Sequence, residues 1–136
     1  MKSVFFYGLF MDDDILRSKG FHPSDGNIAV AKGYGLRIGE KATLVQSSSE
    51  CSYGIVMKLS EEEINSLYSA PGVSEYVPEQ IEVTGQNGST YKVICYNLPL
   101  SKLSGSNREY AKSLSIAARK MGLPDTYVSQ ILAWAE

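Results

Sequence analysis

Two β-prone runs joined by an Asn-Gly turn most strongly constrain what this chain can fold into. Residues 76–84 and 91–98 are rich in Val, Ile, Tyr and Thr, and Asn87-Gly88 lies between them. Asn and Gly tolerate the positive φ angles of a tight hairpin turn, and β-branched and aromatic residues pack well on a pleated sheet. We therefore expect the two runs to pair as antiparallel strands.

Further strand-like runs precede this hairpin. The first is apolar and aromatic and stops at Gly8, while the others are short and separated by Gly33, Gly39 or the serines at 47–49. Gly, Pro and Ser clusters between β-prone runs are typical of turns and loops. The expected strands cover residues 3–7, 28–31, 34–38, 42–45 and 52–59.

Helical patterns lie at three places. One helix begins at the acidic residues 12–14 and ends before Gly20, and a short helix follows Ser60, which forms a capping box with Glu63. Ser106 and Glu109 predict a second capping box for a helix that ends at Gly122, and Pro124 starts a last helix.

This element order predicts an α+β fold with a curved or closed, mainly antiparallel sheet flanked by helices. The length of 136 residues suits one domain, and no repeat or long linker divides it. We expect a single domain over residues 1–136.

Composition argues against several partner classes. A formal net charge of -2 gives no electrostatic reason to expect nucleic acid or an anionic membrane, and no run approaches the roughly 20 apolar residues of a spanning helix. The N-terminus resembles a strand rather than a signal peptide, so we expect a cytoplasmic protein.

No cofactor or metal is expected. His22 is the single histidine, and Cys51 and Cys95 have the spacing of two buried thiols rather than of a metal site. Asp12, Asp13 and Asp14 are interpreted as a solvated helix start, because consecutive helical side chains point in different directions.

Four segments together resemble the γ-glutamylcyclotransferase-like superfamily. Residues 6–11 are similar to its opening Tyr-Gly loop and residues 32–37 to its Gly-Tyr-x-Leu strand. Residues 53–67 resemble its Tyr-Gly-Val strand and the following helix, and Tyr110 with the Gly-Leu-Pro at 122–124 resembles its C-terminal part. The resemblance implies a small β-barrel flanked by helices, with a pocket for a γ-glutamyl amine or a similar acyl-amine ligand.

The same resemblance implies a chemistry. In such cyclotransferases the substrate's α-amine attacks its γ-carbonyl, which releases 5-oxoproline and the amine, and one glutamate moves the proton. Backbone N–H groups of the opening loop stabilise the negative charge that develops on the carbonyl oxygen. The implied binding residues are Tyr7, Gly8, Leu9, Phe10, Met11, Tyr76 and Tyr110. Packing of a strand end and a helix face remains an alternative role for the loop and for Tyr110.

The family's Leu-Asp-x-x-Glu-Gly pattern is altered in this chain. Tyr68 takes the place of the aspartate, and Pro71 takes the place of the proton-transferring glutamate. Proline cannot titrate, and a missing general base typically costs a factor of 10² to 10⁴ in rate. Glu75, four residues further on, is the tentative catalytic replacement, although it also suits a solvated strand start.

Three hypotheses follow. The first is a divergent enzyme of the γ-glutamylcyclotransferase type with Glu75 as base and the loop amides as oxyanion donors. The second is a non-catalytic small-ligand-binding protein. The third is a structural or partner-binding domain whose pocket is filled by Phe10, Tyr68 or Tyr76.

Overall fold

The structure is a computed structural model that describes residues 1–24 and 26–136. Its strands are β1 (Lys2–Phe6), β2 (Asn27–Ile38), β3 (Ala42–Leu59), β4 (Val77–Gly85) and β5 (Thr90–Asn97). Its helices are α1 (Asp13–Ser18), α2 (Glu61–Tyr68), α3 (Arg108–Lys120) and α4 (Asp125–Ala133), with short 3-10 turns η1 (Leu9–Met11) and η2 (Leu100–Lys102).

The described strands close into a barrel in the order β1-β3-β2-β4-β5. Neighbouring strands pair antiparallel except β1 and β5, which run parallel where Val4 meets Ile94. The predicted α+β class and mainly antiparallel barrel are therefore confirmed. The hairpin between β4 and β5 is also confirmed, and Gly88 has a positive φ of 85° at its turn.

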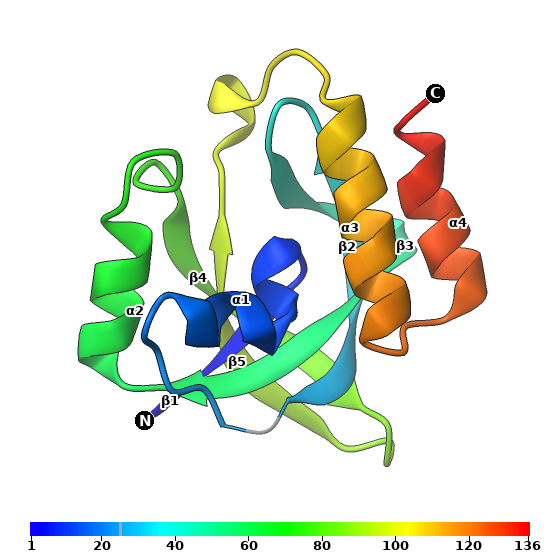
Figure 1. Ribbon diagram of the computed structural model, residues 1–136. Helices are drawn as coiled ribbons and strands as arrows, with labels where there is room; N and C mark the ends of the chain where they lie inside the picture. Colours follow the sequence, from blue (N-terminus) through cyan, green and yellow to red (C-terminus); the bar gives the residue numbers. More distant parts are fainter. Residues whose placement is uncertain (25) are drawn as a thin grey trace.

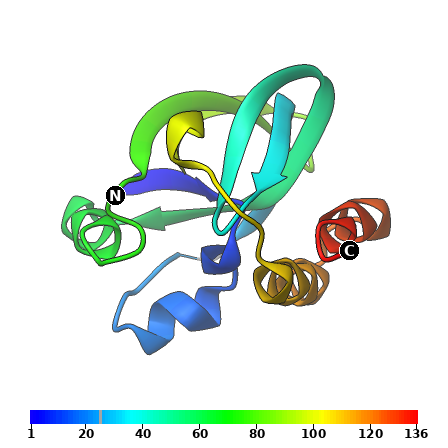
Figure 2. The same ribbon diagram turned by 90° about the horizontal axis from the view of Figure 1, so that it is seen from above.

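The helices cover the barrel on different sides. Helices α3 and α4 lie side by side against one side (Figure 1), and α2 lies at the opposite side, with α1 between them when seen from above (Figure 2). The largest fully buried side chains include Phe5 and Met57 from the barrel and Leu114 and Ile131 from α3 and α4. Burying a side chain of this size contributes roughly 1.5–3 kcal/mol.

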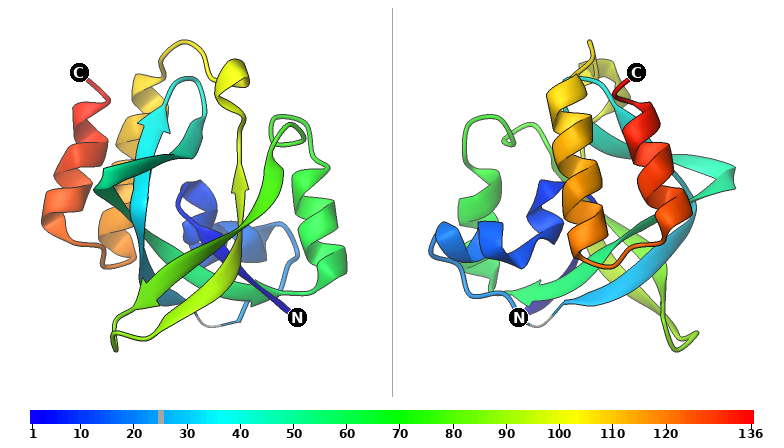
Figure 3. Two further views of the ribbon diagram at one scale, coloured as in Figure 1. Left: turned by 180° about the vertical axis from the view of Figure 1, so that it is seen from behind. Right: turned by 45° about the vertical axis from the view of Figure 1, so that its right-hand side comes forward.

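Four of the predicted strands were too short. The short runs predicted from residue 28 to residue 59 form two long strands, β2 and β3, which Figure 3 shows as one bent hairpin. Pairing of β2 with β3 goes from Lys32 opposite Cys51 directly to Tyr34 opposite Gln46, so the serines at 47–49 lie in an irregularity within β3. The predicted loop is therefore a bulge inside one long strand.

Helix starts were predicted with mixed success. Ser60 and Glu63 form the expected capping box. The second box was wrong, because Asn107 caps α3 by accepting a hydrogen bond of 2.9 Å from the backbone N–H of Tyr110. Within the described residues, no helix has both the length and the apolar character needed to cross a membrane.

Candidate functional site

A cavity of about 260 Å³ lies where four segments that are distant in sequence meet. These segments are the β1–η1 loop, the β2–β3 turn, the segment that joins α2 to β4, and the start of α3. Pockets for drug-sized molecules usually measure about 300–1,000 Å³, so this cavity suits a small metabolite. Its lining consists of Phe5, Phe6, Tyr7, Gly8, Leu9, Phe10, Glu40, Lys41, Ala42, Tyr68, Gly72, Val73, Tyr76, Tyr96 and Tyr110.

The opening loop fits closely against helix α3. A Cβ atom on Gly8 would lie 2.9 Å from the hydroxyl oxygen of Tyr110, which is closer than a carbon atom can comfortably approach. Any larger residue here would require the Tyr110 side chain or the loop to shift, whereas glycine lets the backbone come near the tyrosine and the cavity. In the described part of the chain, no hydrogen-bond acceptor is found for the backbone N–H groups of Gly8 and Phe10.

Aromatic rings form a large part of the cavity wall. Tyr68, at the end of α2, stacks on Tyr96 of β5 with ring centroids 3.8 Å apart and an interplanar angle of 7°. Phe10 meets Tyr68 edge to face at 6.2 Å, and Tyr76 lies 6.4 Å from the same ring. Such pairs are held by ring quadrupoles as well as by burial. The rings line the cavity and leave it open.

Hydrogen bonds fix several of the tyrosines. The Tyr7 hydroxyl donates to the backbone carbonyl of Tyr96 at 2.8 Å, and the Tyr76 hydroxyl donates to the carbonyl of Ala42. Burial raises the pKa of Tyr110 to about 12, although an interaction of its hydroxyl with the Leu9 backbone opposes the rise. Burial also raises the pKa of Tyr7, Tyr68 and Tyr76. These phenols stay neutral at physiological pH, so none acts as a resident base.

The predicted binding residues are brought together with one exception. Tyr7, Gly8, Leu9, Phe10, Tyr76 and Tyr110 all line the cavity. Met11 does not line it, because its side chain is fully buried in the core.

Glu75, the predicted catalytic replacement, lies outside the cavity. Its side chain is 52% exposed, and its carboxylate pairs with the ammonium of Lys102 at 3.4 Å. Pro71 is exposed in the turn after α2, while the next two residues, Gly72 and Val73, reach the cavity wall. The segment thus brings no carboxylate to the cavity.

Glu40 is the acidic residue that lines this cavity, and it was not among the predicted site residues. It lies in the turn between β2 and β3, where its backbone N–H donates to the carbonyl of Ser104 at 2.8 Å. A Gly-Glu-Lys turn after a strand is too common to mark a site in a single sequence. Its position depends on the bend of the β2–β3 hairpin, which sequence patterns do not reveal.

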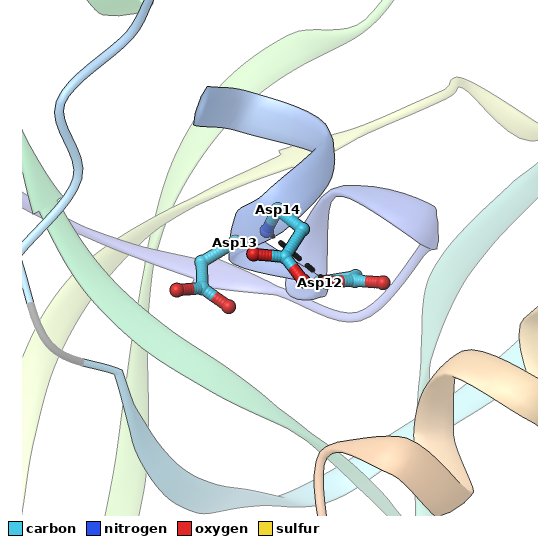
Figure 4. A group of neighbouring side chains, drawn as sticks. All are labelled: Asp12, Asp13 and Asp14. Atoms are coloured by element: carbon cyan, nitrogen blue, oxygen red, sulfur yellow. Dashed lines mark hydrogen bonds between the residues drawn. The ribbon is translucent and has the colours of Figure 1, made fainter. Parts of the chain in front are cut away.

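Asp12, Asp13 and Asp14 come closer together than expected (Figure 4), with oxygen atoms that all lie within 4.8 Å of one another. The expected divergence was wrong because Asp12 is the helix N-cap, whose backbone is not helical. Lys120 of α3 binds Asp12 at 2.9 Å and Asp14 at 2.8 Å. The acids therefore join α1 to α3 through a lysine.

A second hollow lies between the β2–β3 hairpin and α4. Arg37 and Glu50 pair there at 2.8 Å, and Trp134 is 41% exposed. Cys51 also lines this hollow and is exposed, so its predicted burial was wrong, whereas Cys95 is buried as predicted. Cys51 is paired with Lys32 next to the irregularity of the β2–β3 hairpin, and its side chain lies on the strand face that meets solvent.

The fold and the cavity define a small barrel protein with a cavity of small-molecule size beside the β1–η1 loop, and comparisons with known proteins identify its family. The model of the AIG2-like family matches residues 52–131, more than half of the chain. The chain therefore belongs to the AIG2-like family, within the γ-glutamylcyclotransferase-like superfamily.

Individual relatives are more distant. Human gamma-glutamylcyclotransferase is 28% identical over 94 residues, which cover 68% of this chain and 50% of that protein. The chain thus spans about half the length of this curated relative.

Solved structures agree in fold. The uncharacterized human protein loc79017 has a TM-score of 0.82 at 23% identity, and a gamma-glutamyl cyclotransferase has 0.80 at 22%; each comparison covers 97% of this chain and 86% of the other. YkqA from Bacillus subtilis has a TM-score of 0.79 at 21% identity, covering 98% of this chain and 54% of that one.

Proposed function

We propose that this protein binds a γ-glutamyl amine or a similar acyl-amine ligand in the cavity beside Gly8, without the superfamily's usual cyclisation. The observation that carries this proposal is an open cavity bordered by the Tyr-Gly loop. In the neighbouring segment, Pro71 stands in place of the superfamily's base, and the Glu75 carboxylate is exposed to solvent. The open cavity also argues against a pocket filled by Phe10, Tyr68 and Tyr76.

The loop supplies the polar half of this site. The backbone N–H groups of Gly8 and Phe10 have no protein acceptor in the described residues and can donate to a ligand carbonyl. In a cyclotransferase such donors stabilise the oxyanion, but they also bind the ground-state carbonyl. Binding therefore survives the loss of the base, while the proton transfers do not.

Titration with γ-glutamyl ethylamide tests this proposal, with α-glutamyl ethylamide as the matched isomer. We expect saturable binding of the γ isomer, with NMR shifts at the backbone amides of Gly8 and Phe10, and no release of 5-oxoproline. Shifts of equal size with both isomers, or shifts only at other surfaces, would contradict the proposed site.

A second candidate function is cyclotransfer with Glu40 as base. It is favoured by one observation, which is that Glu40 is the acidic residue of the cavity lining. Glu40 would take a proton from the attacking α-amine and return it to the leaving nitrogen as the C–N bond to the amine breaks. Release of 5-oxoproline by the wild type that is lost in Glu40→Gln and kept in Glu62→Gln, an exposed acid on α2, would establish it.

A further inference from the structure

The turn between β2 and β3 is held against the segment that leads into α3 (Figure 1). The backbone N–H of Glu40 donates to the carbonyl of Ser104 at 2.8 Å, and the carbonyl of Glu40 accepts a hydrogen bond of 3.2 Å from the side-chain amide of Asn107. A Cβ atom on Gly39 would lie 2.5 Å from the carbonyl oxygen of Ser104, so the two backbones are in direct contact. Both polar groups of the Glu40 backbone are therefore bound by residues 104–107.

Asn107 also begins helix α3. Its side-chain oxygen accepts a hydrogen bond of 2.9 Å from the backbone N–H of Tyr110. One partner of this amide is a donor and the other, the carbonyl of Glu40, is an acceptor, so only one orientation of the amide satisfies both. Asn, Asp and Ser cap helices about equally well, because each offers an oxygen acceptor. Capping alone therefore needs no NH₂ group, and the NH₂ group of Asn107 is the part that reaches the β2–β3 turn.

The two elements that Asn107 joins both line the cavity. The β2–β3 turn supplies three lining residues, and the first turn of α3 supplies Tyr110, which lies against Gly8 of the loop. The carbonyl of Ala42, at the end of the β2–β3 turn, accepts a hydrogen bond from the hydroxyl of Tyr76. The side chain of Asn107 therefore connects three parts of the cavity wall, which are the loop, the turn and the segment between α2 and β4.

We infer that Asn107 is a positioning residue of the proposed ligand site, which fixes the β2–β3 turn and Tyr110 relative to each other. The inference rests on the proposed function for the use of this cavity as the ligand site. Among the described residues, Asn107 is half-buried and is not part of the cavity lining. Its effect on a ligand therefore passes through the turn and Tyr110, which set the shape of the cavity before a ligand arrives.

Asn107→Asp separates the two hydrogen bonds of this side chain. The carboxylate still caps α3, but it cannot donate to the carbonyl of Glu40. In calorimetric titrations we expect affinity for γ-glutamyl ethylamide to fall roughly three- to tenfold, which is the order of one lost neutral hydrogen bond. Thermal unfolding should change little, because a negative charge at the helix start offsets part of the lost bond. Ser106→Ala, at the exposed neighbouring position, is the matched control and should change neither quantity.

A double-mutant cycle tests whether Asn107 acts through the turn. Tyr76→Phe removes the hydrogen bond to the carbonyl of Ala42 and so frees the same turn from its other partner. The double variant of Asn107→Asp and Tyr76→Phe should lose less affinity than the product of the two single losses, because each change loosens the same element. Single losses that simply multiply would overturn the proposed route through the turn and assign the effect to α3 alone.

The free protein provides a readout that does not depend on any ligand. In Asn107→Asp we expect NMR shifts and faster hydrogen exchange at the backbone amides of Glu40, Lys41 and Ala42. The amide of Arg119, near the other end of α3, should stay unchanged because the cap is kept. Turn amides that do not respond would overturn the inference.

The inference and the proposed function can fail separately. Equal binding of γ-glutamyl ethylamide by the wild type and Asn107→Asp would overturn the positioning role and leave the proposed function standing. A wild type that does not bind this compound, together with turn amides that respond in Asn107→Asp, would remove the γ-glutamyl ligand and support the coupling of the turn to α3 by Asn107.

Discussion

The loop at residues 7–10 and the segment at residues 67–76 border the same cavity, yet they have diverged in different ways. The loop keeps its Tyr-Gly sequence and its close contact with Tyr110, and its side-chain changes leave the backbone donors in place. The segment carries Tyr68 and Pro71 where the superfamily pattern has two acids. In the proposed function, ligand binding and proton transfer therefore depend on separate segments, so one can be lost while the other is kept.

The largest effect, on ligand affinity, is expected for a substitution in the loop at residues 7–10. Gly8→Ala places a Cβ atom 2.9 Å from the Tyr110 hydroxyl, so either the loop or the tyrosine must move. We expect affinity for γ-glutamyl ethylamide to fall by roughly 10- to 100-fold, because the hydrogen bonds from the two backbone donors, each worth about 0.5–1.5 kcal/mol, are misaligned. Calorimetry measures the change.

A double variant tests the cause of this loss. Tyr110→Phe removes the clashing hydroxyl, so Gly8→Ala combined with Tyr110→Phe should recover affinity relative to Gly8→Ala alone. Additive losses in the double variant would show that the contact between Gly8 and Tyr110 is not what shapes the loop.

The second largest effect is a gain of enzymatic activity from a substitution in the segment at residues 67–76. Pro71→Glu restores a carboxylate at the position of the superfamily base, and we expect 5-oxoproline release at least about tenfold above the wild-type background, well short of the 10² to 10⁴ of a fully positioned base. Pro71→Gln is the matched control, since it makes the same backbone change without basicity. Equal release by both variants would argue against a shuttle at this position.

A smaller effect, on stability, is expected for the ion pairs between Lys120 of α3 and the start of α1. Lys120 binds Asp14 and holds the pKa of that carboxyl below its ordinary value of 3.8. A lowered folded-state pKa stabilises the fold above the unfolded-state pKa, and this stabilisation is lost as the pH falls through the lowered value.

Thermal unfolding at several pH values measures this contribution. The wild type should unfold at a slightly higher temperature than Lys120→Met at pH 7, and the difference should shrink below about pH 4. A difference that stays constant from pH 7 to pH 3 would assign the effect of Lys120 to packing of its aliphatic stem.

The smallest effect is expected at Glu75. Its ion pair with Lys102 is solvent-exposed, and such pairs contribute about 0–1 kcal/mol. Glu75→Gln should change ligand affinity less than about twofold and leave any 5-oxoproline release unaltered. A loss of release by 10² in this variant would return Glu75 to the active site and imply that the segment moves when ligand binds.

Local patterns were sufficient to predict much of the fold. The Asn87-Gly88 hairpin, the capping box at Ser60 and the barrel with flanking helices follow from turn chemistry, periodicity and family resemblance. The length of β3 was missed because it depends on pairing with β2. The cap at Asn107 was missed because Ser106 and Asn107 are both favoured N-cap residues, so local sequence does not choose between them.

The candidate site was predictable to a smaller extent. Residues 7–10 carry their own motif, so their place at the cavity could be expected. Glu40 reaches the cavity only through the bend of a long hairpin, and Glu75 is directed to solvent and Lys102 by the turn before β4. The spacing of residues in the sequence predicts neither of these two positions.

Binding without turnover is the central claim, and one measurement tests it directly. Wild-type protein is incubated with saturating γ-glutamyl ethylamide, the bound ligand is followed by NMR, and 5-oxoproline is quantified after many times the lifetime of the complex. We expect intact ligand in the cavity, contacting Gly8 and Phe10, and no 5-oxoproline above the rate of the buffer alone. Steady release of 5-oxoproline and ethylamine in proportion to the protein concentration would contradict this claim.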